Sequence, residues 1–311
     1  MAKSFTRRAL LGATALGLAA TAGVAAGATA EDRSRTEGVS GDRSGQPEAM
    51  APQRDQRMLE LEEGYDARLG VYAFNTGTGA VLAHRPDERF AFCSVFKALV
   101  TAAVLHHNPM SRLDELIRYT EDDLMASSFV TREHVDTGMT IGQLSDAAVR
   151  FSDGTAGNLL LKDLGGPDRL TDYTRLLGDR VTRMDRYEPD IVTAIPGDPR
   201  DTSSPLSLAK DLDTLVLGRA LSRGKRAFLR DLLERNTTGS ARVKAALPPR
   251  WRIGNKTGTG DYGTLNDIAV VWPPDAAPLV LAIMSSKETH DAEGVETVIA
   301  EAAEHVFATI A

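Results

Sequence analysis

The amino-acid sequence predicts an α/β fold combined with an all-α part: an antiparallel sheet domain with flanking helices, interrupted by an all-helical domain. Three observations predict it. Residues 70–84 alternate apolar and polar side chains around a Gly-containing turn, as a β-hairpin does. Residues 251–285 carry β-branched and aromatic side chains in runs separated by glycine and proline. Between these regions the apolar spacing is mainly helical, so we expect a sheet domain built from both ends of the chain.

The predicted sheet domain consists of residues 55–88 and 236–311, and the predicted helical domain of residues 89–235. In the sheet domain we expect, in order, a helix at 56–67, strands at 70–75, 80–84, 251–259, 266–272 and 278–285, and a closing helix at 293–310. In the helical domain we expect helices at 94–107, 141–150, 152–164, 169–177, 206–221 and 225–235. Thr140 and Gln143 fit a capping box. The segment 184–205 is rich in proline and charge, and so long a loop is usually functional or disordered.

The first 54 residues are expected to lie outside this fold. The pair Arg7-Arg8 precedes a run rich in alanine, leucine and glycine that ends in a small-x-small cleavage pattern at Ala30. This pattern resembles a twin-arginine export signal, so residues 1–30 are predicted to be a signal peptide and the protein to be secreted. A transmembrane anchor is the alternative, but the run has few large apolar residues. The composition of residues 31–54 predicts a disordered mature N-terminus.

Composition and charge limit the classes of function. The net charge of −7 over 311 residues argues against nucleic acid or an anionic membrane surface as a partner. Past the first 30 residues, no stretch is long and apolar enough to span a membrane. Cys93 is the only cysteine, so an intramolecular disulfide cannot form, and the six histidines make no ligand pattern. We expect a monomer that uses no metal and no cofactor.

The segment 92–100 contains the central chemical pattern. Ser94 begins an apolar run at helical spacing, and Lys97 follows three residues later, so the two side chains share one helix face. A helix N-terminus favours developing negative charge and offers free backbone N–H groups. An amine there can accept the serine proton if burial or cationic neighbours lower its pKa. Because Ser-x-x-Lys also arises by chance, the pair predicts a nucleophile only together with other groups.

Three further segments could supply those groups. Ser152, in Ser-Asp-Gly, could relay a proton to a leaving amine, although a serine at this place is more often the N-cap of a helix. The run Lys256–Gly260 could bind a carboxylate, although it also fits a glycine-rich strand end. Glu188 in the long loop could act as general base on a water, although a single loop glutamate is usually only solvated.

Together and in this order, these segments resemble the class A serine β-lactamases, whose motifs are Ser-x-x-Lys, Ser-Asp-Asn and Lys-Thr-Gly. The resemblance runs from about Met58 to the C-terminus. It includes Asn158, which follows the second motif as in the family's Thr-Ala-x-Asn-Leu-Leu, and residues 194–202, which match its omega loop. The resemblance implies the β-lactamase/transpeptidase-like fold and hydrolysis of β-lactam rings, an activity that confers resistance.

The resemblance also implies a role for each site residue. Ser94 would attack the β-lactam carbonyl to form an acyl-enzyme, and Glu188 would be the base of deacylation. Whether Lys97 or Glu188 is the acylation base stays open. Ser152 would protonate the ring nitrogen, and backbone N–H groups of Ser94 and Thr259 would form the oxyanion hole. The other implied residues are Lys256, Thr257, Gly258, Thr259, Arg242 and Asn158 for substrate binding, and Arg186 and Asp201 as an ion pair within the omega loop.

Four positions depart from the family pattern. Gly154 stands where the second motif has Asn, and Val192 replaces an omega-loop Asn that helps hold the hydrolytic water. Ser127 occupies the place of a cleft-wall tyrosine. Leu265 stands where many members have a carboxylate-binding arginine, and Arg242 is expected to substitute for it. We therefore expect a working penicillinase with an altered preference among substrates.

Two other functions share parts of this pattern. A penicillin-binding transpeptidase or carboxypeptidase of the same superfamily would be acylated but would hydrolyse slowly. A non-catalytic β-lactam-binding sensor would keep a persistent adduct on Ser94. The presence of Glu188 argues against both, so a secreted β-lactam hydrolase is the preferred prediction.

Overall fold

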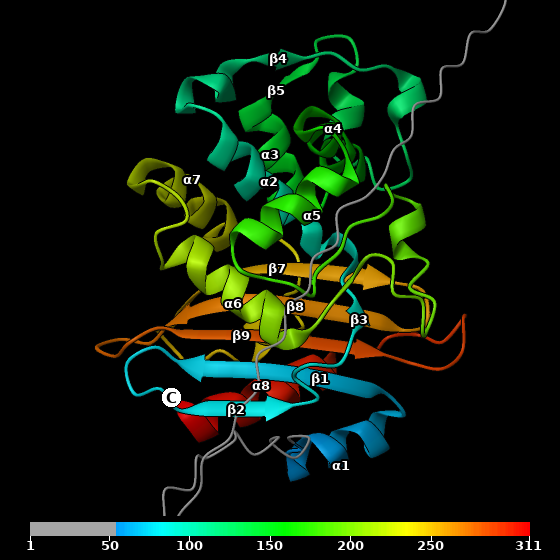
Figure 1. The fold of residues 1–311 in the computed structure, drawn as a ribbon. Coiled ribbons are helices and arrows are strands. Elements are labelled where there is room, and N and C mark those ends of the chain that lie inside the picture. The colour runs from blue at the N-terminus through cyan, green and yellow to red at the C-terminus, as the bar shows by residue number, and fades with distance from the viewer. Residues whose placement is uncertain (1–53) are drawn as a thin grey trace, which may run out of the picture. The chain divides into compact units, whose positions relative to one another are not determined.

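The structure, a computed structural model, describes residues 54–311, and their centre is a five-stranded antiparallel sheet (Figure 1). Its strands are β1 (Arg68–Asn75), β2 (Val81–His84), β7 (Arg252–Gly260), β8 (Thr264–Trp272) and β9 (Leu279–Ser286). Their order in space is β2-β1-β9-β8-β7, so the N-terminal hairpin pairs with the last strand, Val71 opposite Ile283. The predicted fold class, with a sheet built from both ends of the chain, is confirmed.

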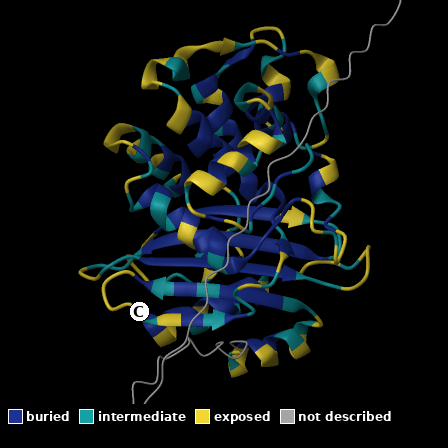
Figure 2. Ribbon diagram, viewed as in Figure 1, coloured by how far each residue is buried: buried dark blue, intermediate teal, exposed yellow. Residues whose placement is uncertain are grey.

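Both faces of this sheet are covered. Successive residues of a strand point to opposite faces, and β9 illustrates the consequence. Leu279, Leu281 and Ile283 join an apolar cluster with helices α1 (Gln56–Tyr65) and α8 (Thr297–Ile310). Val280, Ala282 and Met284 join a second cluster, which includes α6 (Pro205–Val216) and the other helices. The central strands are therefore buried almost throughout (Figure 2).

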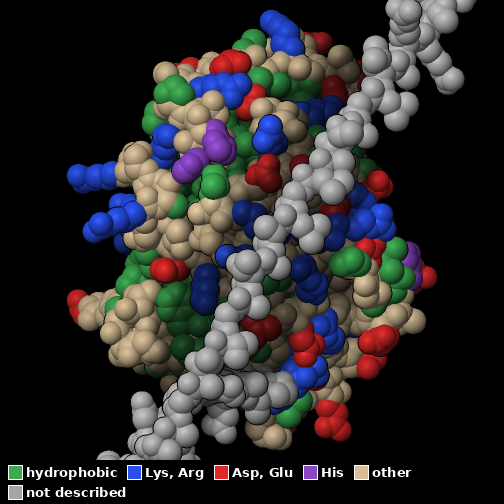
Figure 3. Space-filling view, viewed as in Figure 1, with side chains coloured by type: hydrophobic (Ala, Val, Ile, Leu, Met, Phe, Trp, Pro, Cys, Tyr) green, Lys and Arg blue, Asp and Glu red, His purple; other side chains and the backbone are tan. Residues whose placement is uncertain are grey.

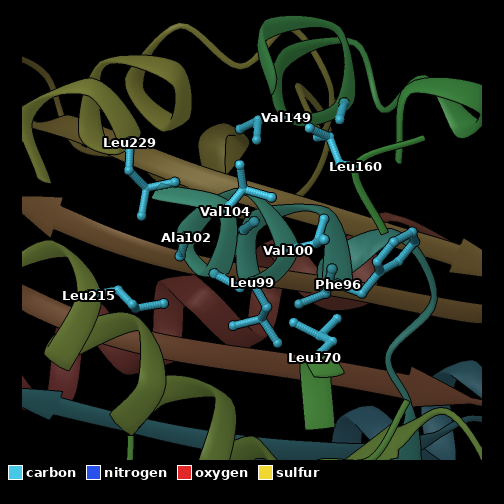
Figure 4. Packing of buried hydrophobic residues seen from close by; sticks show 14 of the residues in the cluster. Phe96, Leu99, Val100, Ala102, Val104, Val149, Leu160, Leu170, Leu215 and Leu229 are labelled. Atoms are coloured by element: carbon cyan, nitrogen blue, oxygen red, sulfur yellow. The ribbon is translucent and has the colours of Figure 1, made fainter. Parts of the chain in front are cut away.

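Helix α2 (Phe96–His107) is the centre of the helical part. All its residues from Phe96 to Leu105 are buried, as expected of a helix that is apolar on every side. It contacts α3 (Ile141–Arg150), α4 (Gly154–Leu164), α5 (Pro167–Leu176) and α7 (Arg223–Glu234). In Figure 4, Leu99 and Val104 of α2 lie among apolar side chains of these neighbours and of α6. Ser94, two residues before α2, and Lys97, in its first turn, are thus attached to a fully buried helix.

Short elements connect these helices. The two-residue strands β3 (Phe90–Ala91) and β6 (Thr202–Ser203) pair with each other, as do β4 (Leu116–Ile117) and β5 (Met139–Thr140). The 3₁₀ turns are η1 (Cys93–Val95), η2 (Met110–Asp114), η3 (Glu121–Asp123), η4 (Thr131–His134), η5 (Asp190–Val192) and η6 (Val243–Ala246). The β3–β6 pair therefore connects the residues just before η1 with the end of the long loop 184–205.

Helix boundaries differ from the prediction where caps decide them. The helix predicted at 152–164 begins at Gly154, because Asp153 is its N-cap and accepts a hydrogen bond from Ala156 N at 2.9 Å. The helix predicted from residue 169 begins at Pro167, a residue favoured in the first turn. The helix predicted at 206–221 ends at Val216, and the closing helix begins at Thr297 instead of 293.

Several predictions fall on residues that the structure does not describe. The signal peptide at 1–30 and all of the segment 31–54 except Arg54 lie outside the described residues, so export and secretion stay predictions. Arg54 itself forms an ion pair with Glu88 at 2.9 Å. The boundaries between the sheet domain and the helical domain also stay predictions.

The described surface carries charges of both signs. On the face in Figure 3, Lys and Arg side chains are interspersed with Asp and Glu. Within residues 54–311, no helix has the length and apolarity needed to cross a membrane. The same residues contain no group of three or more His, Cys, Asp and Glu side chains placed to hold a metal ion.

Candidate active site

A cavity of about 490 Å³ lies where strand β7 faces the helical part. Its walls come from η1, the turn 125–129, the residues before α4, the long loop and β7. The predicted residues among them are Ser94, Ser152, Glu188, Arg242, Thr257 and Thr259. Lys97 and Lys256 lie directly behind this wall and are completely buried. The structure therefore brings together side chains from four segments that are far apart in the sequence.

Ser94 lies in η1, one turn before Lys97. Lys97 Nζ donates to Ser94 Oγ at 2.8 Å, and Ser94 Oγ donates to Glu188 Oε1 at 3.0 Å. The preceding residue, Cys93, has φ +48°, a backbone conformation that non-glycine residues rarely adopt and that is often found at functional sites. Burial raises the pKa of the Cys93 thiol, so the hydroxyl next to it is the better candidate nucleophile.

All three N–H donors of Lys97 have acceptors. Besides Ser94 Oγ, the ammonium lies 2.6 Å from Glu188 Oε1 and donates to Ser152 O at 2.9 Å. A buried charge is tolerated only when it is paired in this way. The lysine therefore has contacts with the nucleophile, the loop carboxylate and the segment before α4.

Ser152 is not the cap of α4, so that alternative interpretation was wrong. Asp153 caps the helix, and its carboxylate also accepts from Val130 N at 2.8 Å. Ser152 has φ +57°, and its hydroxyl accepts a hydrogen bond from Lys256 Nζ at 3.1 Å. Burial, and after it the charge of Lys97, lowers the pKa of Lys256 well below its usual value. A lysine in this state can release its proton to the serine more readily than an exposed one.

Strand β7 presents threonine hydroxyl groups to the cavity, and the segment before η6 contributes Thr238 and Arg242. Thr257 Oγ1 lies 2.7 Å from Thr238 Oγ1, and Arg242 Nη2 donates to Thr259 Oγ1 at 2.7 Å. Residue 258 must be glycine, because a Cβ there would lie 2.5 Å from the carbonyl oxygen of Phe92.

Arg242 is fixed in place by the backbone around it. It donates to Gly258 O at 2.8 Å and to Asn266 O at 2.9 Å, and its Nε pairs with Glu296 at 2.8 Å. Leu265, the family's usual arginine position, is buried opposite Thr259 in the cluster beneath α8. Arg242 is therefore the arginine that reaches this end of the cavity.

Glu188 is held through its backbone. Asn158 Nδ2 donates to Glu188 O at 2.8 Å, and Glu188 N donates to Asn158 Oδ1 at 3.0 Å. Both ends of the Asn158 amide are thus used, and the side chain is not part of the cavity wall. In place of the predicted substrate contact, the structure gives Asn158 a contact that positions Glu188.

Arg186 and Asp201 form the expected ion pair. Arg186 Nε donates to Asp201 Oδ2 at 2.6 Å, and Asp201 Oδ1 accepts from the backbone N–H groups of Asp185 and Arg186 at 2.7 and 3.0 Å. Asp201 is completely buried. The pair closes the loop that carries Glu188.

Some residues of the cavity wall were not predicted. They are Met125, Ala126, Phe129, Phe151, Pro189, Thr238, Gly239 and Glu296. None belongs to a motif, and their place in the wall depends on how separate loops pack. Sequence proximity could have indicated four of them, because Phe151 and Pro189 adjoin Ser152 and Glu188, and Thr238 and Gly239 lie close to Arg242.

Comparisons with known proteins identify the family of this chain. The model of the beta-lactamase enzyme family matches residues 53–310. The chain is 55% identical over 261 residues to the beta-lactamase of Mycobacterium tuberculosis strain H37Rv, covering 82% of this chain and 85% of the relative. It is 52% identical over 252 residues to the beta-lactamase of Amycolatopsis lactamdurans, covering 81% and 83%.

Solved structures of similar proteins give the same picture. A halotolerant bacterial beta-lactamase superposes with a TM-score of 0.81 at 45% identity, covering 82% of this chain and 98% of the other. A class A beta-lactamase from Clostridium kluyveri DSM 555 superposes with a TM-score of 0.80 at 42% identity, covering 81% and 96%.

Proposed function

Because the chain belongs to the beta-lactamase enzyme family, we propose that this β-lactam hydrolase opens penicillins, and also cephalosporins, through an acyl-enzyme on Ser94. The observation that carries the proposal is the contact of one hydroxyl with Glu188, a carboxylate that can accept its proton, and with Lys97, whose amine can accept it when neutral. Ser94 Oγ lies 2.8 Å from Lys97 Nζ and 3.0 Å from Glu188 Oε1. A serine so placed can lose its proton as it attacks a carbonyl carbon.

In acylation, Ser94 Oγ bonds to the β-lactam carbonyl carbon, and its proton passes to Lys97 or Glu188. The backbone N–H groups of Ser94 and Thr259 stabilise the charge on the carbonyl oxygen. The C–N bond of the ring then breaks, and Ser152 gives its proton to the nitrogen. Lys256, whose pKa is lowered by burial, returns a proton to Ser152 over their 3.1 Å contact. The proton taken from Ser94 then passes from Lys97 or Glu188 to Lys256, so Glu188 is a carboxylate again before deacylation.

The substrate carboxylate binds at the end of the cavity formed by β7. Thr257, Thr259 and Arg242 line this end, with Lys256 behind them. Guanidinium and hydroxyl groups together suit a carboxylate, because they provide charge as well as directed hydrogen bonds.

In deacylation, Glu188 takes a proton from a water molecule whose oxygen bonds to the ester carbonyl carbon. The bond from that carbon to Ser94 Oγ breaks, and the proton on Glu188 returns to the serine. Asn158 supports this step by holding the backbone of Glu188.

The test is ring opening of benzylpenicillin and a cephalosporin by the purified protein, with Ser94→Ala beside it. We expect many turnovers by the wild type and none by the variant, because the variant has no nucleophile. Intact mass should show the acyl adduct on the wild type and on Cys93→Ala, the matched control for the adjacent thiol. Full turnover by Ser94→Ala would sink the proposal. One equivalent of product followed by silence would point to a penicillin-binding transpeptidase or a sensor.

A further inference from the structure

The backbone at residue 154 has no space beside it for a side chain. A Cβ built on Gly154 would lie 2.2 Å from Ser127 Oγ, 2.3 Å from Glu188 Oε2 and 2.5 Å from Met125 Sδ. Real Cβ atoms do not approach other heavy atoms this closely, so a side chain at 154 would have to displace the ends of these three side chains. The volume in which the Asn of the related motif would begin is therefore occupied by a serine hydroxyl and the loop carboxylate.

Ser127 lies this close because its turn is anchored to the start of α4. Gly154 N donates to Ser127 O at 3.0 Å. The next residue, Ser128, is buried; its hydroxyl lies 2.7 Å from Thr155 Oγ1 and accepts from Met125 N at 2.9 Å. The hydroxyl of Ser127 is therefore presented from a fixed backbone.

The two carboxylate oxygens of Glu188 have different partners. Oε1 lies beside the nucleophile, at 2.6 Å from Lys97 Nζ and 3.0 Å from Ser94 Oγ. Oε2 accepts from Ser127 Oγ at 3.4 Å and has no other hydrogen-bond donor within residues 54–311. Val192, which replaces the Asn of the related loops, offers no side-chain donor.

We propose that Ser127 is a positioning residue for deacylation: its hydroxyl orients Glu188 Oε2 toward the attacking water. The inference rests on the proposed function, in which Glu188 removes a proton from that water. It also explains the glycine at 154, since any side chain there would displace the Ser127 hydroxyl. One hydroxyl thereby takes over the orientation that the related Asn at position 192 would otherwise help provide.

The geometry separates the two halves of the reaction. Ser127 forms no hydrogen bond with Ser94 or Lys97, so its loss removes none of the acylation contacts of Oε1. Slower deacylation with unchanged acylation lowers kcat and KM together and leaves kcat/KM unchanged. A merely structural defect in the turn would not produce this signature.

The experiment compares Ser127→Ala with the wild type on benzylpenicillin, by steady-state rates and by intact mass during turnover. We expect kcat and KM each to fall about tenfold. This lies at the lower end of the range of effects for losing a hydrogen bond to a charged group, because the distance of 3.4 Å from Ser127 Oγ to Glu188 Oε2 is long. The acyl-enzyme should accumulate during turnover.

Ser145→Ala is the control for removal of a buried hydroxyl, since Ser145 donates to Ile141 O at 2.8 Å and does not line the cavity. It should not accumulate acyl-enzyme. Unchanged kcat in Ser127→Ala, or equal accumulation in both variants, would overturn the inference while leaving the proposed function intact. A wild type that opens no ring would instead overturn the proposed function, and the inference with it.

Discussion

Asp267 shows how single buried charges are balanced behind the cavity. It lies on β8 opposite Thr257 and is completely buried. Its carboxylate accepts from Asn255 Nδ2 at 2.8 Å and from Val243 N at 3.3 Å, so it holds the residue that follows Arg242. Burial raises the pKa of Asp267 to about 7, although these hydrogen bonds and the charge of Arg242 act in the opposite direction.

This raised pKa predicts a pH dependence of stability. The folded protein keeps the Asp267 proton up to a pH of about 7, whereas the unfolded carboxyl loses it near a pH of about 4. Protonated Asp267 therefore stabilises the folded protein fully at pH values below the unfolded pKa. This stabilisation, at most about 4 kcal/mol, is lost as the pH rises through the folded pKa. The wild type should lose unfolding free energy across this window relative to Asp267→Asn, in urea titrations at several pH values.

Asp275→Asn removes a carboxylate from an exposed turn and is the control for loss of one charge. A difference between wild type and Asp267→Asn that stays constant across the window would contradict the prediction.

At the scale of single residues, the sequence indicates contacts between residues a fixed number of positions apart, but not contacts that depend on three-dimensional packing. Ser94 and Lys97 are three residues apart, so a helical pattern suffices to bring them together. Glu188 is 94 residues from Ser94, and only the resemblance to a family indicated that they belong to one site. The contact of Ser127 with Glu188 depends on the volume left free at Gly154, which no motif encodes.

Among the elements, the loop 184–205 has the most direct bearing on function. A long irregular segment must be fixed by its own contacts if it is to position a side chain. Its end is bound to the core by the β6–β3 pair, and its first part by the contact of Asn158 with Glu188. The Arg186–Asp201 pair closes it from within. Glu188 therefore lies on a segment that is fixed at several points.

Asp201→Asn should loosen this loop. The change keeps the side-chain shape but removes the charge that faces Arg186, and breaking such a buried pair costs about 3 kcal/mol. We expect lower stability in urea unfolding and a lower kcat, because Glu188 is no longer held in one place.

Arg200→Ala provides the control on the same loop, since it breaks a more exposed ion pair with Asp198 and should cost less than about 1 kcal/mol. Wild-type kcat in Asp201→Asn would show that the pair does not position the loop.

Element prediction succeeded where capping chemistry was unambiguous. Thr140 and Gln143 form the expected capping box, and α3 covers the predicted residues. In Ser152-Asp153-Gly154 two residues could cap, and the structure uses the aspartate. The two-residue strands β3 to β6 were not predicted, because two residues carry no period.

At the scale of the whole described unit, β9 links the two apolar clusters. Its alternate residues face opposite sides of the sheet, so one strand contributes to the core beneath α8 and to the core of the helical part. Alternation in residues 70–84, with β-branched and aromatic runs in residues 251–285, was sufficient to predict a sheet built from both ends. The pairing of β1 with β9 was not predicted, because strand order depends on contacts distant in sequence.

Because both apolar clusters share β9, we expect a destabilising mutation in either cluster to lower the unfolding transition of both. Ile283 and Met284 are completely buried on opposite faces of β9, and truncation of either to alanine should cost about 2–5 kcal/mol. The two tryptophans of the chain report on different cores: Trp251 packs against the cluster beneath α8, and Trp272 against the helical cluster.

The measurement uses two single-tryptophan proteins, made with Trp251→Phe or Trp272→Phe, so that the fluorescence of the remaining tryptophan reports on one cluster. Each alanine variant should lower the thermal midpoint by the same amount in both proteins. Val81→Ala, at an exposed position of β2, should change the free energy of unfolding by less than about 0.5 kcal/mol. If Ile283→Ala moved the Trp251 transition alone, the two cores would be independent. Some contact other than the shared strand would then have to fix the position of Ser94, at the helical part, relative to Lys256 on β7.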